Sequence, residues 1–246
     1  MALGVLAGCG RTLPPLRGKI EVGRDGYAVF VAGNGPAGGD LYAVRAEGGE
    51  AIPITFTNVG EMRPRLSPDG TSIVFLRGGS LTDSTPITVW VLNLNNGAER
   101  ELALPKGANR PTEAAWSEGG RAVIVAAGTS LFRFDAPPAT ADARPVEGAN
   151  RAMAESSLAV LLGDPAFTRV VPCEGSSLCT AAKSGSQDLL ARNARDALPW
   201  GPDSVAYFTH EGAEVRPLGA GMSRRLEITG PPDARQMTAF MGRRSR

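Results

Sequence analysis

The chain has 246 residues, 42% of them hydrophobic and 21% charged, with 26 basic side chains against 25 acidic ones. This near-balance argues against a broad nucleic-acid-binding face, which needs a basic excess, and the apolar content argues against global disorder. Gly and Pro number 31 and 19, which favours many turns over long helices. The single histidine, His210, rules out a multi-histidine metal site and the HExxH hydrolase motif.

Near the start of the chain, Leu6, Ala7, Gly8 and Cys9 follow a short apolar stretch. They resemble the lipobox of bacterial lipoproteins, where a signal peptide is cut before a cysteine that is then lipidated. The resemblance implies that Cys9 carries acyl chains, and that residues 1–17 are a signal segment and a short tether. The alternative is a chance LAGC in a chain rich in Ala and Gly. No other run approaches the ~18 apolar residues of a membrane span.

A turn followed by an apolar strand recurs along the chain, most clearly at Ser67-Pro68-Asp69-Gly70, with Phe75 in the following strand. In such a turn proline presets φ, aspartate accepts hydrogen bonds and glycine takes positive φ. The other copies surround Asp25-Gly26, Gly119-Gly120, Asp164, Pro202-Asp203 and Asp233. The anchors at residues 25, 69, 118, 164, 203 and 233 are 44, 49, 46, 39 and 30 residues apart. Most of these spacings fit the ~40–45-residue period of a four-stranded propeller blade.

The repeats resemble the WD40-like repeats of TolB-type β-propellers over residues 18–241. We therefore expect an all-β fold, a β-propeller of five four-stranded antiparallel blades, followed by a basic tail at 242–246. The expected blades span about 18–57, 61–104, 110–147, 155–191 and 195–229. A last strand at 232–241 is available to close the ring, and six blades are the alternative if it pairs with N-terminal strands. We expect a strand at 158–162, although residues 150–163 also have the pattern of a short helix.

Cys173 and Cys179 flank a turn-like segment, Glu174 to Leu178. Facing residues of two adjacent antiparallel strands lie within disulfide range, so we expect the two cysteines to be bonded. A disulfide would place the chain in an oxidising compartment. The alternative is a pair of reduced thiols in the cytosol, whereas a CxxC redox or zinc site does not fit the spacing.

The remaining candidates for chemistry have structural interpretations, and we assign no catalytic residue, metal or cofactor. The Asp-Gly pairs lack the DxDxDG pattern of a calcium loop. The segment from Gly33 to Gly39 lacks the lysine of a phosphate-binding loop, and we expect a hairpin there. His210 is expected at a turn, since no GxSxG motif accompanies it. Trp116 and Trp200 occupy equivalent repeat positions, which favours packing between blades over a sugar-stacking platform.

The resemblance implies contact with other proteins through the faces and loops of the propeller. We therefore expect a non-enzymatic interaction scaffold in the bacterial cell envelope, as a periplasmic or outer-membrane lipoprotein. Its expected partners are other envelope proteins and, through the lipid anchor, a membrane, but not nucleic acid. The alternatives are a propeller that binds a small ligand or glycan, and a propeller hydrolase or lactonase with polar groups at the central channel.

Overall fold

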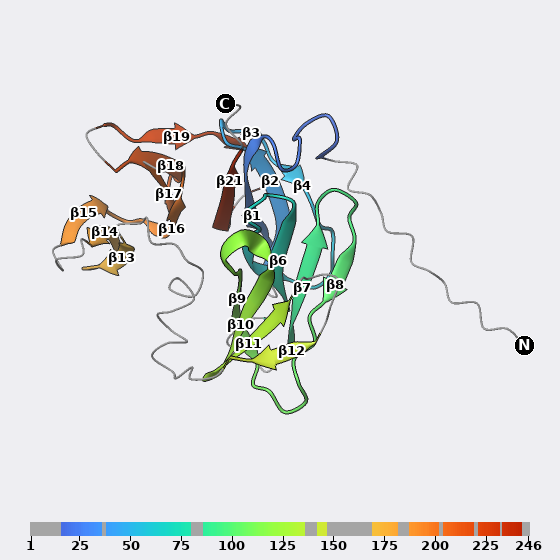
Figure 1. The fold of residues 1–246 in the computed structure, drawn as a ribbon. Coiled ribbons are helices and arrows are strands. Elements are labelled where there is room, and N and C mark those ends of the chain that lie inside the picture. Colours follow the sequence, from blue (N-terminus) through green and yellow to red (C-terminus); the bar gives the residue numbers. More distant parts are fainter. Residues whose placement is uncertain are drawn as a thin grey trace, which may run out of the picture.

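The computed structural model describes nine segments of the chain, and the expected repeat copies around Asp164 and Pro202-Asp203 lie outside them (Figure 1). They are residues 16–35, 38–79, 86–135, 142–146, 169–181, 187–201, 204–218, 221–231 and 233–242. These segments form antiparallel sheets joined by turns, with only short helical turns such as Glu118–Gly120. No helix in the described segments has the length and apolar character needed to cross a membrane.

The first blade combines strands from both ends of the described chain. Its order is β21-β1-β2-β4, so the strand latest in sequence is its innermost one (Figure 1). The bounds are β1 (Gly26–Gly35), β2 (Gly38–Arg45), β4 (Ile52–Pro53) and β21 (Arg235–Met241). Gly35 pairs with Gly38, which confirms the hairpin expected in the glycine-rich segment. A short parallel pair of β3 (Gly49–Glu50) and β20 (Ile228–Thr229) adds a second link between the two ends.

The second and third blades are four-stranded meanders in sequence order. The second contains β5 (Glu61–Leu66), β6 (Ser72–Gly78), β7 (Ile87–Asn93) and β8 (Glu99–Glu101). The third contains β9 (Pro111–Trp116), β10 (Ala122–Ala127), β11 (Ser130–Asp135) and β12 (Ala143–Pro145). One bridge between Gly39 and Glu61 links the first blade to the second.

The fourth and fifth blades follow the same pattern. Three strands of the fourth are described, and the strand or helix expected within 150–163 lies outside the described residues. The fourth contains β13 (Arg169–Cys173), β14 (Ser177–Ala181) and β15 (Gln187–Ala191). The fifth contains β16 (Arg195–Pro199), β17 (Ser204–Thr209), β18 (Gly212–Pro217) and β19 (Arg224–Leu226).

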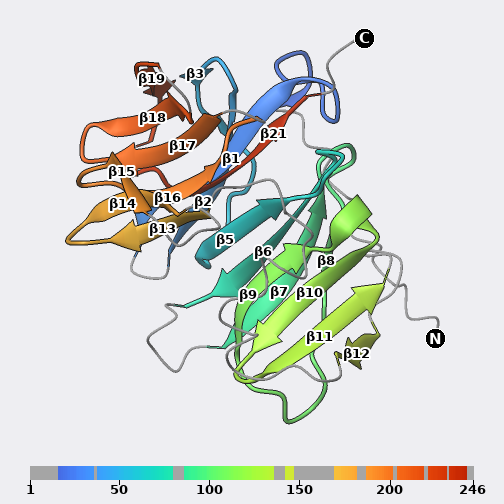
Figure 2. The ribbon, with the colours of Figure 1, turned by 60° about the vertical axis from the view of Figure 1, so that its left-hand side comes forward.

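The five blades fan around a common axis, as in a β-propeller (Figure 2). The innermost strand β21 contacts both β16 and β5, and β5 contacts β9 in turn. This arrangement confirms the expected fold with five blades among the described residues. The six-blade alternative assumed that the last strand pairs with N-terminal strands, and β21 does pair with β1. This pairing completes the first blade and does not start a sixth one.

Apolar side chains fill the spaces between neighbouring blades. Phe30, Trp200 and Phe208 belong to the core between the first and fifth blades, while Trp116 and Phe134 belong to the core between the second and third. Trp116 and Trp200 are 6% and 5% exposed, and Trp116 Nε1 donates a hydrogen bond to the Arg65 carbonyl at 2.9 Å. The expected role of both tryptophans in blade packing is confirmed.

The repeat turn is held by hydrogen bonds that do not depend on its whole motif. In the second blade the Ser67 N–H donates to Ser72 O at 2.8 Å, and the Gly70 N–H donates to Ser67 O at 2.8 Å. In the third blade Ser117 makes the same pattern, accepting from the Gly120 N–H at 2.9 Å. The turn therefore persists in a copy that lacks the Pro-Asp pair, because its serine and second glycine are retained.

Candidate functional site

The two faces of the propeller differ in the loops that they carry. Each blade is an antiparallel meander, so the repeat turns of residues 67–71 and 117–121 lie on one face, here called the turn face. The segments that join blades, such as 54–60 and 102–110, lie on the opposite face, here called the connection face. The innermost strands begin at the connection face, so their first residues surround the axis there.

Of the four innermost strands that the structure describes, three carry the same β-bulge close to their starts. In β5, β16 and β21 two residues oppose one residue of the next strand. The first bulge residue has a left-handed backbone in each case, with φ of 52° at Arg63, 55° at Asp196 and 52° at Gln236. Such conformations cost about 1–3 kcal/mol for a residue other than glycine and concentrate at functional sites. The bulges therefore mark the axis at the connection face as a candidate site.

Side chains at these bulges form a chain of contacts across four blades, which we call the axial belt: Asp196, Gln236, Arg63 and Glu113. The Gln236 N–H donates to the Asp196 carboxylate at 3.3 Å. The Arg63 N–H donates to Gln236 Oε1 at 2.7 Å, and the Arg63 guanidinium donates to Glu113 Oε2 at 2.7 Å. The bulges of β5 and β21 thus each direct an N–H toward a side chain of the neighbouring blade, which offsets part of the backbone strain.

At one end of the axial belt, Glu113 also pairs with a second arginine, Arg65, which lies outside the belt. Arg65 Nη2 lies 3.2 Å from Glu113 Oε1, so Glu113 is shared by two guanidinium groups. The side chains of Arg63 and Arg65 are 35% and 42% exposed, whereas that of Glu113 is 19% exposed. A guanidinium has five N–H donors in a planar fork that suits carboxylates and phosphates. The pair can therefore bind a further anionic group from solvent.

A well-ordered loop presents apolar side chains on the same face. Phe56 is 75% exposed and Val59 is 44% exposed, both in the connection between the first two blades. Between them, Thr57 donates its hydroxyl to Val59 O at 2.6 Å and its N–H to Asp40 Oδ1 at 3.0 Å. The hydrogen bonds fix the loop, so the exposure of the aromatic ring reflects the folded state.

A buried ion-pair network holds this loop in place. Glu61 has no exposed surface; it accepts a hydrogen bond from the Thr55 hydroxyl and from Arg77 Nη2 at 2.9 Å. Arg77 also bonds Glu99 at 2.8 Å and lies 4.6 Å from the centre of the Trp90 ring. Burial raises the pKa of Glu61, and the bonds from Thr55 and Arg77 oppose that shift without cancelling it. The network holds the start of β5 and the loop together.

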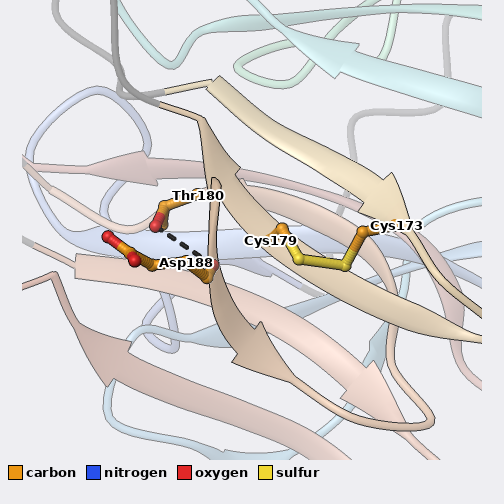
Figure 3. The surroundings of a disulfide bond; sticks show 4 residues. All are labelled: Cys173, Cys179, Thr180 and Asp188. Atoms are coloured by element: carbon orange, nitrogen blue, oxygen red, sulfur yellow. Dashed lines mark hydrogen bonds between the residues drawn. A yellow bond between two sulfur atoms is a disulfide. The ribbon is translucent and has the colours of Figure 1, made fainter. Parts of the chain in front are cut away.

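The predicted disulfide is present in the fourth blade (Figure 3). Cys173 and Cys179 are bonded with their Cα atoms 5.8 Å apart. They are not directly opposite each other, because Cys173 pairs with Ser177 and Cys179 pairs with Val171. The bond therefore runs diagonally across the β13–β14 hairpin, while Thr180 bonds the next strand through Asp188 O at 3.3 Å.

The other predicted site residues occupy separate places. Pro68, Asp69 and Gly70 form the repeat turn, whereas Asp25 directly precedes β1, which begins at Gly26, and accepts the Glu21 N–H at 2.8 Å. Asp233 lies in the connection that precedes β21, not in a turn within one blade as the repeat suggested. Cys9, Pro202 and Asp203 fall outside the described residues.

The described residues contain no cluster of three or more His, Cys, Asp or Glu side chains that could hold a metal ion. His210 lies at the turn between β17 and β18 and its side chain is 77% exposed.

The sequence interpretation missed the axial belt, because the three bulges carry three different residue types, Arg, Gln and Asp, and therefore show no repeated motif. A weak signal did exist. Each bulge opposes a large aromatic residue at the same place in the second strand of its blade: Phe75, Tyr207 and Phe30. In the third blade that place holds Val125, which pairs directly with Ala114.

Comparisons with known proteins concern the fold only. No protein-family model matches the sequence, and no curated protein sequence matches it. Among solved structures, TolB from Acinetobacter baumannii is similar with a TM-score of 0.44 and 13% identity, over 87% of this chain and 66% of that one. The β-propeller domain of the Trilobed protease from Pyrococcus furiosus has a TM-score of 0.35 and 13% identity, over 81% and 52%.

A third solved structure, dihydro-heme d1 dehydrogenase NirN in complex with DHE, has a TM-score of 0.36 and 17% identity, over 86% of this chain and 46% of that one. The chain thus spans less than two thirds of the length of these three structures. They include a protease domain and a dehydrogenase beside TolB, and all TM-scores lie below 0.5. These likenesses accordingly assign neither an activity nor a partner to the chain.

Proposed function

We propose that this protein is a non-enzymatic binding propeller that contacts another envelope protein through its connection face. The observation that carries the proposal is the exposed Phe56 ring, held on a hydrogen-bonded loop of the connection face. Aromatic and arginine side chains are enriched in protein interfaces and dominate their binding energy. The connection face offers both kinds within one region, with Arg63 and Arg65 next to the loop's anchor.

The proposed location is the cell envelope, with the chain anchored by lipid at Cys9. The disulfide between Cys173 and Cys179 supports an oxidising compartment, and the lipobox-like LAGC supports an anchor. Expression of the gene with its upstream region, with and without the signal-peptidase inhibitor globomycin, tests this part. We expect an unprocessed precursor to accumulate with the inhibitor. A product that stays cytosolic, unlipidated and insensitive to globomycin would refute the anchor.

Site-specific photo-cross-linking tests the binding face. A photoreactive phenylalanine analogue placed at position 56 is expected to give a discrete adduct with an envelope protein in intact cells. Met222 offers the matched control, since it is 92% exposed but lies between β18 and β19, on the turn face. The same analogue at position 222 should give no such adduct.

The substitution Phe56→Ser then measures how much the ring contributes. Loss of an exposed aromatic anchor is expected to weaken capture of the cross-linked partner about tenfold or more, since central aromatic anchors contribute about 2 kcal/mol. The substitution Met222→Ser should leave capture unchanged. Equal capture by both variants, or adducts from both positions, would remove the connection face as the binding surface.

A further inference from the structure

A cavity of about 380 Å³ lies on the connection face, where β7, the end of β8 and the connection that follows β8 form its wall. Its volume falls in the range of small-ligand sites. The lining residues Ile87, Val89 and Leu102 are buried in the core between the second and third blades, so packed side chains form one side of the wall. Pro105 and Asn109 also line the cavity and are exposed, so the cavity reaches solvent.

The composition of the wall favours an aliphatic ligand. Most of the lining residues are apolar, and none of those that the structure describes is aromatic. The wall therefore offers no stacking surface for a sugar or a planar ring. The branched side chains of Ile87, Val89 and Leu102 instead suit an alkyl group, which gains affinity from the burial of apolar surface.

The wall also holds one cation. Arg110 is the only basic residue among the described residues of the lining. It directly precedes β9, and β9 contacts β7, so it lies close to the strand that carries Ile87 and Val89. Arg110 is half-buried and its Nε atom is buried, so its stem packs against the protein and does not extend into solvent.

A guanidinium at this place suits a carboxylate. Its five N–H donors form a planar fork, so it can bind a carboxylate and a group of the protein at the same time. A single guanidinium also balances the one charge of a carboxylate, whereas a phosphate monoester carries nearly two. The cation of the wall therefore favours a carboxylate as the polar group of the ligand.

The acidic residue of the lining, Glu101, does not oppose such a ligand. Glu101 pairs with Trp90 in the β7–β8 ladder. The next residue, Leu102, donates its N–H to Val89 O. Successive side chains of a strand point to opposite faces of the sheet, and Val89 and Leu102 face the third blade, whereas Trp90 packs against the core of the first two blades. The Glu101 carboxylate therefore lies on the Trp90 face, away from the apolar wall.

We propose that this cavity binds a short aliphatic carboxylate, with its alkyl group against Ile87, Val89 and Leu102 and its carboxylate on Arg110. The two parts of the site belong to one cavity, so one small molecule can contact both. This site goes beyond the proposed function, because its ligand is a small molecule and not a partner protein.

Binding of hexanoate to the intact protein, followed by ligand-observed NMR, tests the proposal. Hexanamide has the same alkyl chain without the charge, and we expect hexanoate to bind about tenfold more tightly, as a charge-assisted contact does. The substitution Arg110→Gln should weaken hexanoate to the level of hexanamide and leave hexanamide unchanged. Arg121→Gln is the matched control, because it removes an exposed arginine at the turn face; it should bind hexanoate as the parent does.

Acetate and a cavity-filling variant test the apolar part. Acetate has the carboxylate but lacks the methylene groups of hexanoate, each of which contributes about fourfold in affinity when buried. We therefore expect acetate to bind about 100-fold more weakly. The substitution Ala108→Trp places an indole in the cavity and should abolish binding of hexanoate and hexanamide. Its control is Ala103→Trp in the same connection, where the residue is exposed and does not line the cavity.

Any one of the following results would overturn the inference: no binding of hexanoate, equal binding of hexanoate and hexanamide, acetate bound as tightly as hexanoate, or unchanged hexanoate binding by Arg110→Gln. The measurements on the parent protein and on Arg110→Gln decide the question even if Ala108→Trp does not fold. Failure here is separable from failure of the proposed function. The adduct at position 56 is measured without hexanoate, and Phe56→Ser should bind hexanoate as the parent does.

Discussion

The Tyr27 hydroxyl donates a hydrogen bond to the Gly70 carbonyl at 2.5 Å, across 43 residues of chain. This bond joins the second strand of the first blade to the repeat turn of the second blade. Phe240 of the closing strand completes the contact, with its ring centre 6.0 Å from that of Tyr27. The repeat turn of the second blade thus packs against the strand that closes the ring.

The substitution Gly70→Ala is expected to destabilise the fold by more than about 2 kcal/mol. Gly70 has φ of +66°, and a Cβ there would lie 2.5 Å from the Phe240 ring, so strain and overlap add. Gly175→Ala is the matched control, because Gly175 has φ of +67° with no atom within 4 Å. Urea denaturation of both variants measures the difference, and equal losses would show that the Phe240 contact contributes nothing.

Tyr27 is expected to make stability fall at high pH. Burial raises the pKa of Tyr27, and the nearby Asp69 charge raises it further. The unfolded phenol loses its proton near pH 10, whereas the folded phenol keeps it. The contribution of the protonated Tyr27 phenol to stability is therefore complete below pH 10 and is lost as pH rises beyond it. The free energy of unfolding of Tyr27→Phe, measured at pH 8 and 10.5, should fall less than that of the parent protein.

Removing the cation of the buried Glu61–Arg77 ion pair is expected to lower the free energy of unfolding by about 3–5 kcal/mol. The substitution Arg77→Met would leave the Glu61 carboxylate buried without its cation, since the Glu61 side chain has no exposed surface. The double variant Glu61→Gln with Arg77→Met removes both charges and should recover much of the loss. Thermal and urea unfolding of the three proteins measure the coupling. A double variant no more stable than the single one would argue against an ionic cause.

Gln236→Ala is expected to lower the free energy of unfolding by about 1–3 kcal/mol, because the half-buried Arg63 N–H loses its acceptor. The control is Gln187→Ala on β15, where the glutamine is exposed and no belt residue is near. If both substitutions have the same effect on urea unfolding, the belt does not stabilise the junction of the first two blades.

Replacing both bridging cysteines, as Cys173→Ser with Cys179→Ser, is expected to cost about 2 kcal/mol, because the closed loop is short. Reduction of the parent protein should produce the same loss, while the double variant should not respond to reductant. A parent protein equally stable with and without reductant would contradict the predicted contribution.

Much of the architecture could be predicted from the sequence, because turn residues and strand residues are local signals. Pro68, Asp69 and Gly70 determine a turn whatever surrounds them, and their spacing sets the blade period. The partner of the last strand could not be derived this way, since β21 pairs with β1 across nearly the whole chain. The same long-range pairing puts Asp233 in the connection before β21, whereas the sequence predicted a repeat turn there.

The candidate site was harder to predict, because it depends on a bulge in each of three strands. Whether Arg63 adopts a left-handed backbone is decided by the neighbouring blade, which supplies Gln236 as acceptor. A cavity on the connection face is likewise a product of packing, because two separate stretches of chain, which include Ile87 and Leu102, form its wall. Residue patterns along the sequence do not reveal these contacts between distant segments.

The position of β21 inside the first blade also governs the order of assembly during synthesis. A ribosome adds about 5–20 residues per second, so β1 emerges roughly 10–40 s before the strand that covers its inner edge. Throughout that interval the nascent first blade exposes unpaired backbone groups. A holding chaperone, or translocation in an unfolded state, would protect this edge until the final strand arrives.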